Sequence, residues 1–172
     1  MSDLANRERT SGGRSDVERH EETWQLLKEL LASQRFAVLS TESETGPYAS
    51  LIAFWAAADL SHIGFVTMRA TRKFNHLAAH PRVALLFDDR SNRDIDVREA
   101  MAVTAQGTAR ELTDEGARAL ALDEFVAKHP HLASFAATPG CALVRVVVDT
   151  YYVVTHFQSV VELHMPGSEN AG

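Results

Sequence analysis

Hydrophobic residues follow a helical period near the start of the chain. They recur every three or four residues at Trp24, Leu27, Leu30 and Leu31. This spacing is typical of one face of an amphipathic helix and predicts a helix over residues 16–33. Ser15 precedes it, with Glu18 three positions later, which is the pattern of a capping box. The apolar face of this helix requires a surface to cover.

After residue 35 the pattern changes to short apolar runs separated by polar turns. These runs predict strands over residues 36–41, 48–57, 62–68, 82–87, 101–111 and 141–154, the last continued over 157–163. The turns between the first three strands are too short for a parallel crossover, so we expect these strands to pair antiparallel. On the last strand, alternation places one set of side chains on a common face: Val144, Val146, Val148, Tyr152 and Val154.

Two further helices are predicted between the strands. One covers residues 72–79 and ends before Pro81, and the other is capped by Thr113 and runs to about Lys128. The absence of a strand–helix alternation and of a GxGxxG segment argues against a dinucleotide-binding Rossmann fold. We therefore expect a mainly β protein with flanking helices, an antiparallel barrel of six or seven strands in meander order.

Length and composition fit one soluble domain. We expect it to span residues 15–165, between a disordered polar tail over 1–14 and a flexible tail over 166–172. No apolar run is long enough to cross a bilayer, and the N-terminus lacks a hydrophobic signal core. The single cysteine, Cys141, precludes an internal disulfide and is expected to be a buried structural thiol. Together these features predict a cytoplasmic protein.

A local basic cluster stands out against the net charge of −6, which otherwise argues against nucleic-acid or membrane partners. It consists of Arg69, Arg72 and Lys73, with Arg82 nearby. Thr71 is a favourable N-cap, so free N–H groups at this helix start attract an anion, and the cations add charge there. A phosphate monoester would neutralise them, whereas the alternative is solvated side chains paired with acids of the next loop, Asp88 or Asp89. The residues alone leave both interpretations open.

Several segments resemble the pyridoxamine 5′-phosphate oxidase-like family of FMN-binding split barrels. The resemblance covers residues 24–163 and rests on the order of the elements and on five motifs. They are Phe36-Ala-Val-Leu-Ser-Thr, Gly46-Pro-Tyr-Ala-Ser-Leu-Ile, Gly64-Phe-Val-Thr, Thr71-Arg-Lys-Phe-Asn-His-Leu-Ala-Ala-His-Pro-Arg-Val-Ala-Leu-Leu-Phe and Ala105-Gln-Gly-Thr-Ala-Arg-Glu-Leu. The longest motif is the most specific, because it joins the phosphate loop, a short helix, a proline and the next strand.

The resemblance implies a homodimer with two FMN molecules in the subunit interface. The strand containing Ser50, Leu51 and Ile52 would lie along the flavin, and the strand end at Thr67 and Met68 would continue this wall. The phosphate would be held by the residues matching the family's phosphate loop: Thr71, Arg72 and Lys73, with Asn75 on the same helix. The implied function is that of a flavin-dependent oxidoreductase acting on a small-molecule substrate, with the chemistry carried by the flavin.

Two departures from the family pattern narrow this expectation. In the vitamin-B6 oxidases of the family that this chain resembles, an arginine stands at the position of Ser50. Those oxidases also end in a C-terminal Arg-x-His segment. The segment from Val161 onward contains no such motif. We therefore expect a flavin-dependent oxidoreductase other than a true pyridoxamine 5′-phosphate oxidase.

Other functions remain open at this stage. One is a non-redox module that binds flavin or haem, with an axial ligand drawn from His129, His131, His156 or His164. Another is a reductase that uses a deazaflavin coenzyme. His76 and His80 share a helix face but have no third ligand nearby, so no metal site is predicted. The charged loop over residues 88–99 is expected to be solvated, or to act as a lid or dimer contact.

Overall fold

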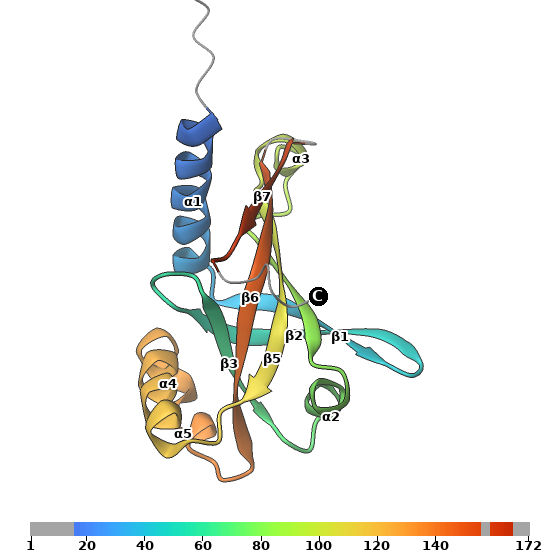
Figure 1. Ribbon diagram of the computed structural model, residues 1–172, viewed down its shortest axis with the longest axis vertical. Coiled ribbons are helices and arrows are strands. Elements are labelled where there is room, and N and C mark those ends of the chain that lie inside the picture. Colours follow the sequence, from blue (N-terminus) through green and yellow to red (C-terminus); the bar gives the residue numbers. More distant parts are fainter. Residues whose placement is uncertain (1–15, 156–158, 167–172) are drawn as a thin grey trace, which may run out of the picture.

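Seven antiparallel strands form one sheet that closes into a barrel (Figure 1). The computed structural model describes residues 16–155 and 159–166. Its strands are β1 (Phe36–Ser43), β2 (Gly46–Ala56), β3 (His62–Met68), β4 (Arg82–Asp88), β5 (Ala102–Glu111), β6 (Cys141–Thr155) and β7 (Ser159–His164). Pairing runs in the order β3-β2-β1-β4-β5-β6-β7, and a further pairing of β3 with β6 closes a ring of six strands. The predicted six- to seven-stranded antiparallel barrel is thus confirmed.

The order of the strands differs from the predicted meander. β1 pairs with both β2 and β4, so β4 does not lie beside β3, which precedes it in the chain. The connection between them contains helix α2 (Arg72–Ala79), and it is long enough to pass across two strands. The sequence predicted the elements but not this crossing. Only short loops indicate that consecutive strands are neighbours, and the connection between β3 and β4 is long.

The barrel core is filled by inward-facing aromatic and aliphatic side chains. Phe54 and Phe87 pack edge to face with ring centroids 4.7 Å apart. Buried Tyr151 donates its hydroxyl hydrogen to the Leu60 carbonyl at 2.7 Å, which satisfies the one polar group of this side chain. Helix α1 (Asp16–Ser33) covers part of the core, as its pattern predicted, with three leucines that are almost fully buried: Leu27, Leu30 and Leu31. Ser15, the predicted cap, lies outside the described residues.

A second apolar layer lies on the outside of the barrel. Helix α4 (Glu115–Lys128) packs Phe125 against Trp55, with ring centroids 5.9 Å apart. The Trp55 ring lies directly over Gly64, where a Cβ atom would approach Trp55 Cζ2 to 2.1 Å. The N-cap of α4 is Asp114 and not the predicted Thr113, because the Asp114 side chain accepts from the Ala117 N–H at 2.8 Å.

Three short helices lie outside the predicted elements. They are α3 (Asp96–Glu99), the 3₁₀-helix η1 (Pro130–Leu132) and α5 (Ala133–Ala136). Cys141, which follows them, is buried and donates from Sγ to the Phe135 carbonyl, as expected of a structural thiol. None of the helices in the described residues is long and apolar enough to cross a membrane.

A β-bulge changes the side-chain alternation of β6. Gln106 pairs with Thr150 and Gly107 with Val148, so Asp149 has no partner on β5. Beyond the bulge, Tyr151 and Val153 point into the core, whereas Tyr152 is only partly buried. The prediction that Tyr152 and Val154 share a face with Val144, Val146 and Val148 is therefore wrong: one extra residue inverts the alternation.

Candidate functional site

The predicted site residues lie where β2 and β3 stop pairing with each other. These strands pair only over Phe54–Ala56 and Ile63–Phe65. Beyond that point Ser50–Ile52 pair with β1, while Thr67 and Met68 pair with β6. The two groups of residues therefore belong to strands that separate, which is the split of the barrel.

Thr71 occupies the N-cap position of α2 but does not cap the helix with its side chain. Its φ and ψ of −89° and 152° are those of an N-cap. Its hydroxyl instead donates to the Met68 carbonyl at 2.8 Å and lies 3.2 Å from the hydroxyl of buried Thr67. The predicted N-cap position is right, and the Thr71 side chain forms no capping bond. No capping side chain therefore competes for the first N–H groups of α2, which have no partner within the helix.

Arg72 and Lys73 carry charges that no neighbouring acid neutralises. Within residues 16–155 and 159–166, neither side chain forms an ion pair or a hydrogen bond. The acids considered as partners are engaged elsewhere. Asp88 pairs with Arg90 at 3.0 Å, and Asp89 accepts from the Met101 N–H at 2.8 Å. The predicted pairing with Asp88 or Asp89 is therefore wrong, and the alternative to an anion site is two solvated side chains.

The other two cations of the basic cluster are neutralised. Arg69 donates from Nε to Glu111 Oε1 at 3.0 Å and from a terminal nitrogen to the Pro139 carbonyl. Arg82 forms an ion pair with Asp149, the bulged residue of β6. The predicted cluster therefore divides into two arginines with structural partners, Arg69 and Arg82, and two cations without a partner among the described residues. The latter, Arg72 and Lys73, lie in the first turn of α2.

Helix α2 is held against the β1–β2 hairpin by its second half. His76 Nδ1 lies 3.1 Å from Thr41 Oγ1, and the His76 ring packs edge to face on Tyr48 at 5.5 Å. A cleft of about 480 Å³ lies between this hairpin and α2, and both Arg72 and Asn75 line it. His76 thus positions the helix that carries the free cations.

The three predicted residues of β2 have different surroundings. Ile52 is buried in the core, so only its backbone is available to a ligand at the surface. Leu51 points outward and is 65% exposed. Ser50 Oγ is buried and has no hydrogen-bond partner among the described residues. A buried hydroxyl without a partner is unfavourable.

The described histidines considered as haem ligands lie on different elements, at the end of α4, on η1 and on β7. His129 is buried, and its Nε2 donates to the Phe54 carbonyl at 2.8 Å; burial lowers its pKa. His164 Nδ1 lies 3.1 Å from Thr150 Oγ1, and His131 is exposed. His156 lies outside the described residues. In the described part of the chain, no group of three His, Cys, Asp or Glu side chains could hold a metal ion.

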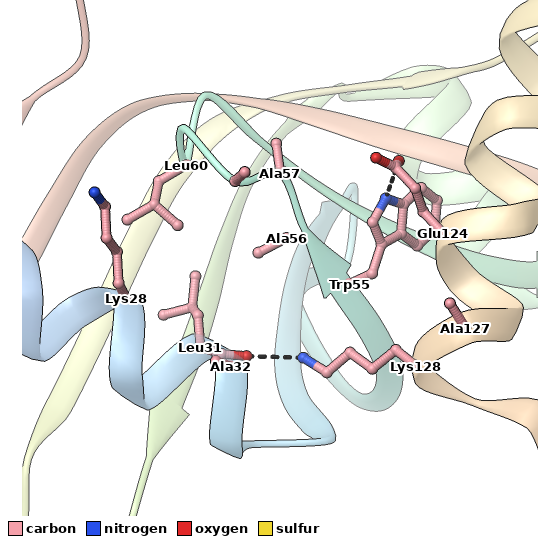
Figure 2. A pocket seen from close by; sticks show the side chains of 11 residues that line it. Lys28, Leu31, Ala32, Trp55, Ala56, Ala57, Leu60, Glu124, Ala127 and Lys128 are labelled. Carbon is pink, nitrogen blue, oxygen red and sulfur yellow. Dashed lines mark hydrogen bonds between the residues drawn. The ribbon is translucent and has the colours of Figure 1, made fainter.

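A cavity of about 490 Å³ between α1, the end of β2 and α4 was not predicted (Figure 2). Half-buried Lys128 reaches into this region, donates to the Leu31 carbonyl at 2.8 Å and lies 3.8 Å from the centre of the Phe54 ring. Burial, with Arg35 nearby, lowers the pKa of Lys128 to about 8. In the same wall Trp55 Nε1 donates to Glu124 at 2.9 Å. None of the nine predicted site residues lines this cavity.

A family model described as pyridoxamine 5′-phosphate oxidase matches residues 23–155. This range contains every strand of the barrel ring and the α2 site. The chain belongs to the pyridoxamine 5′-phosphate oxidase family. A search of curated proteins found no match.

Solved structures similar to this family member have low sequence identity and support the fold alone. A haem-binding protein from Mycobacterium smegmatis is 16% identical with a TM-score of 0.72, and covers 89% of this chain and 60% of its own. An FAD-binding protein from Mesorhizobium loti is 18% identical with a TM-score of 0.60, covering 74% and 89%. HutZ, a haem storage protein from Vibrio cholerae, is 12% identical with a TM-score of 0.63, covering 80% and 92%. The chain spans only about three fifths of the length of the mycobacterial protein.

Proposed function

We propose that this protein is a homodimeric, FMN-dependent oxidoreductase of the cytoplasm that acts on a small molecule other than pyridoxamine 5′-phosphate. The observation that carries the proposal is the pair of unneutralised cations, Arg72 and Lys73, in the first turn of α2. Cations near a helix N-terminus are unfavourable by about 0.3–1 kcal/mol each. A bound phosphate monoester reverses this penalty, because it accepts from the guanidinium, the ammonium and the free backbone N–H groups together.

The surrounding residues fit the phosphate and the ring of FMN. Thr67 and Thr71 place two linked hydroxyls at the junction of β3 and α2. The partnerless Ser50 hydroxyl lies on β2, the strand proposed to follow the flavin. Ser50 replaces the arginine of the vitamin-B6 oxidases, so the phosphate depends more heavily here on Arg72 and Lys73. Asn75, which lines the same cleft as Arg72, is proposed as a further polar contact.

An exposed apolar strip on the barrel supports a dimer. Val38 is the register partner of both Leu51 and Leu86, which places the three side chains in one row across β2, β1 and β4. Leu51 is 65% exposed, and Phe36, two residues from Val38 on β1, is 55% exposed. A contiguous apolar patch of this kind is typical of a protein interface. Because Leu51 belongs both to this strip and to the proposed flavin wall, FMN would lie at the subunit boundary.

The protein's part in the proposed chemistry is to bind and orient the cofactor. FMN, when bound, supplies hydride and electron transfer. Arg72 and Lys73 hold its phosphate end, and the β2 and β3 strand ends orient its ring. The proposal assigns no residue of the chain as a general acid or base, because the flavin carries the redox chemistry.

The proposal is tested by cofactor titration of the purified protein. We expect the absorbance bands of oxidised flavin, one FMN per chain, and bleaching of these bands by an anaerobic nicotinamide donor. The alternative cofactor is haem, because two structural neighbours are named as a haem-binding and a haem storage protein. A stoichiometric Soret band after haem addition, with no FMN binding, would sink the proposal. Tighter binding of a deazaflavin than of FMN would show that the cofactor is a deazaflavin. FMN that binds but is reduced by no donor would indicate a flavin-storage module instead of an oxidoreductase.

A further inference from the structure

Two arginines face each other on the outside of the barrel, away from α2. Arg110 on β5 and Arg145 on β6 are register partners, so their side chains leave the same face of the sheet. That face is the outer one, because Ala109 and Val144, on the opposite alternation, are buried in the core. Like charges directly opposite each other on neighbouring strands are destabilising.

No acid compensates this arginine pair in the part of the chain that the structure describes. Neither Arg110 nor Arg145 forms an ion pair or a side-chain hydrogen bond there. The closest acid in sequence, Glu111, is bound to Arg69. Glu124, on the covering helix α4, accepts from the Trp55 indole instead. The pair is therefore a concentration of positive charge on a protein whose net charge is −6.

Arg145 is only partly exposed, which makes its missing partner more costly. Its register partner on β3 is Gly64, which lies under the Trp55 ring. The Nε atom of Arg145 is buried and has no hydrogen-bond partner. Leaving a buried donor unsatisfied costs about 1–3 kcal/mol, and more when the group is charged.

We propose that Arg110 and Arg145 form a second binding site, separate from the α2 site, for the phosphate group of a small molecule. Two guanidinium groups offer paired donors that match the oxygens of one phosphate. Val147, 49% exposed beside these residues, provides an apolar contact for the rest of the ligand. The arginines lie on β5 and β6, and β6 contacts α4.

The test uses full-length protein carrying Arg72→Ala and Lys73→Ala, so that the α2 site does not bind the probe. Inorganic phosphate is titrated against sodium chloride of equal ionic strength, with binding followed by calorimetry and unfolding temperature. We expect saturable binding with phosphate only. Arg110→Gln and Arg145→Gln should each weaken phosphate affinity about tenfold or more, as the loss of one charge-assisted contact implies. Arg98→Gln, an exposed arginine on α3, is the matched control and should leave the affinity unchanged.

A second readout separates a binding site from a merely structural charge. Without phosphate and at low salt, Arg110→Gln should raise the unfolding temperature, since it removes the facing like charge. A fall in unfolding temperature would show that Arg110 is structurally bonded and would overturn the proposal. Stabilisation by phosphate no greater than by chloride would also overturn it. Equal stabilisation by acetate would overturn the assignment to phosphate.

Discussion

The hydroxyl of Thr71 donates to the Met68 carbonyl at 2.8 Å and so turns away from the helix that it precedes. The side chain thereby stabilises the turn between β3 and α2 and leaves the first N–H groups of α2 to another acceptor. Two unpaired cations, Arg72 and Lys73, follow immediately. This arrangement is the reason for the proposal that the first turn of α2 binds an anion.

Replacing Thr71 by Asp supplies the capping side-chain hydrogen bond that Thr71 does not form. A carboxylate at the N-cap position accepts from the free N–H groups and is favoured by the helix dipole. We expect the apoprotein to gain about 0.5–1 kcal/mol in unfolding free energy, the usual range for an N-cap. FMN affinity should fall at least tenfold, because the carboxylate occupies the phosphate position. Urea denaturation and FMN titration measure the two effects.

Thr71→Ser is the control for this substitution, since it keeps the hydroxyl and should change neither quantity by much. An Asp variant that binds FMN as tightly as wild type would show that the cofactor phosphate lies elsewhere.

Gly64 is expected to be irreplaceable for packing. A Cβ atom there would lie 2.1 Å from the Trp55 ring, which is fixed by Phe125 and by its bond to Glu124. Gly64→Ala should therefore destabilise the protein by about 1–3 kcal/mol, as overpacking does. Gly116→Ala on α4, where the nearest atom is 3.4 Å away, should be neutral or slightly stabilising. Equal stability of the two variants in urea denaturation would contradict the Trp55 packing described here.

Lys128 should make stability depend on pH in the alkaline range. Its pKa is lowered to about 8, whereas an unfolded lysine has the ordinary value of 10.5. Between these values the unfolded chain binds more protons at this residue than the folded one, so its contribution to stability rises as pH rises from 8 to 10.5. The charged side chain destabilises the fold below pH 8. Lys128→Met should remove this slope, while Lys28→Met, which lines the same cavity from an exposed position, should retain it.

The measurement is unfolding free energy across that pH range, compared between variants so that other titrating groups cancel. Parallel curves for wild type and Lys128→Met would mean that Lys128 is solvated as an ordinary lysine.

A charge placed on the exposed apolar strip should disrupt the proposed dimer. Leu86→Lys should convert the proposed dimer to a monomer, because Leu86 lies in the row with Val38 and Leu51. Leu120→Lys, at a 69% exposed position of α4, is the matched control and should leave the assembly unchanged. Sedimentation velocity decides between the outcomes. A wild-type protein that sediments as a monomer with FMN bound would contradict an interface site.

The sequence alone located most elements because their patterns are local. The 3.6-residue period of Leu27, Leu30 and Leu31 determines α1, and the apolar runs determine the strands. The hairpin of β1 and β2 is longer than predicted, since Ser43 pairs with Gly46 and only two residues form the turn. These last pairs escaped prediction because their residues, such as Glu42, are exposed and show no apolar pattern on either strand.

The features that escaped prediction depend on contacts between distant residues. The bulge at Asp149 is set by its neighbours on β5 and reverses the direction of Tyr152. The partners of the basic cluster also come from elsewhere in the chain: Glu111 for Arg69 and Asp149 for Arg82. The sequence therefore predicted a cluster of cations at α2 but could not tell which of them remain unpaired.

The most direct test of the central claim is the FMN affinity of wild type and of the Arg72→Ala, Lys73→Ala double variant. Removing two charge-assisted phosphate contacts should weaken binding at least about a hundredfold. The unfolding temperature without cofactor should stay unchanged or rise, because neither side chain has a partner in the described part of the chain. A double variant that folds and binds FMN with wild-type affinity would contradict the claim that the first turn of α2 holds the cofactor phosphate.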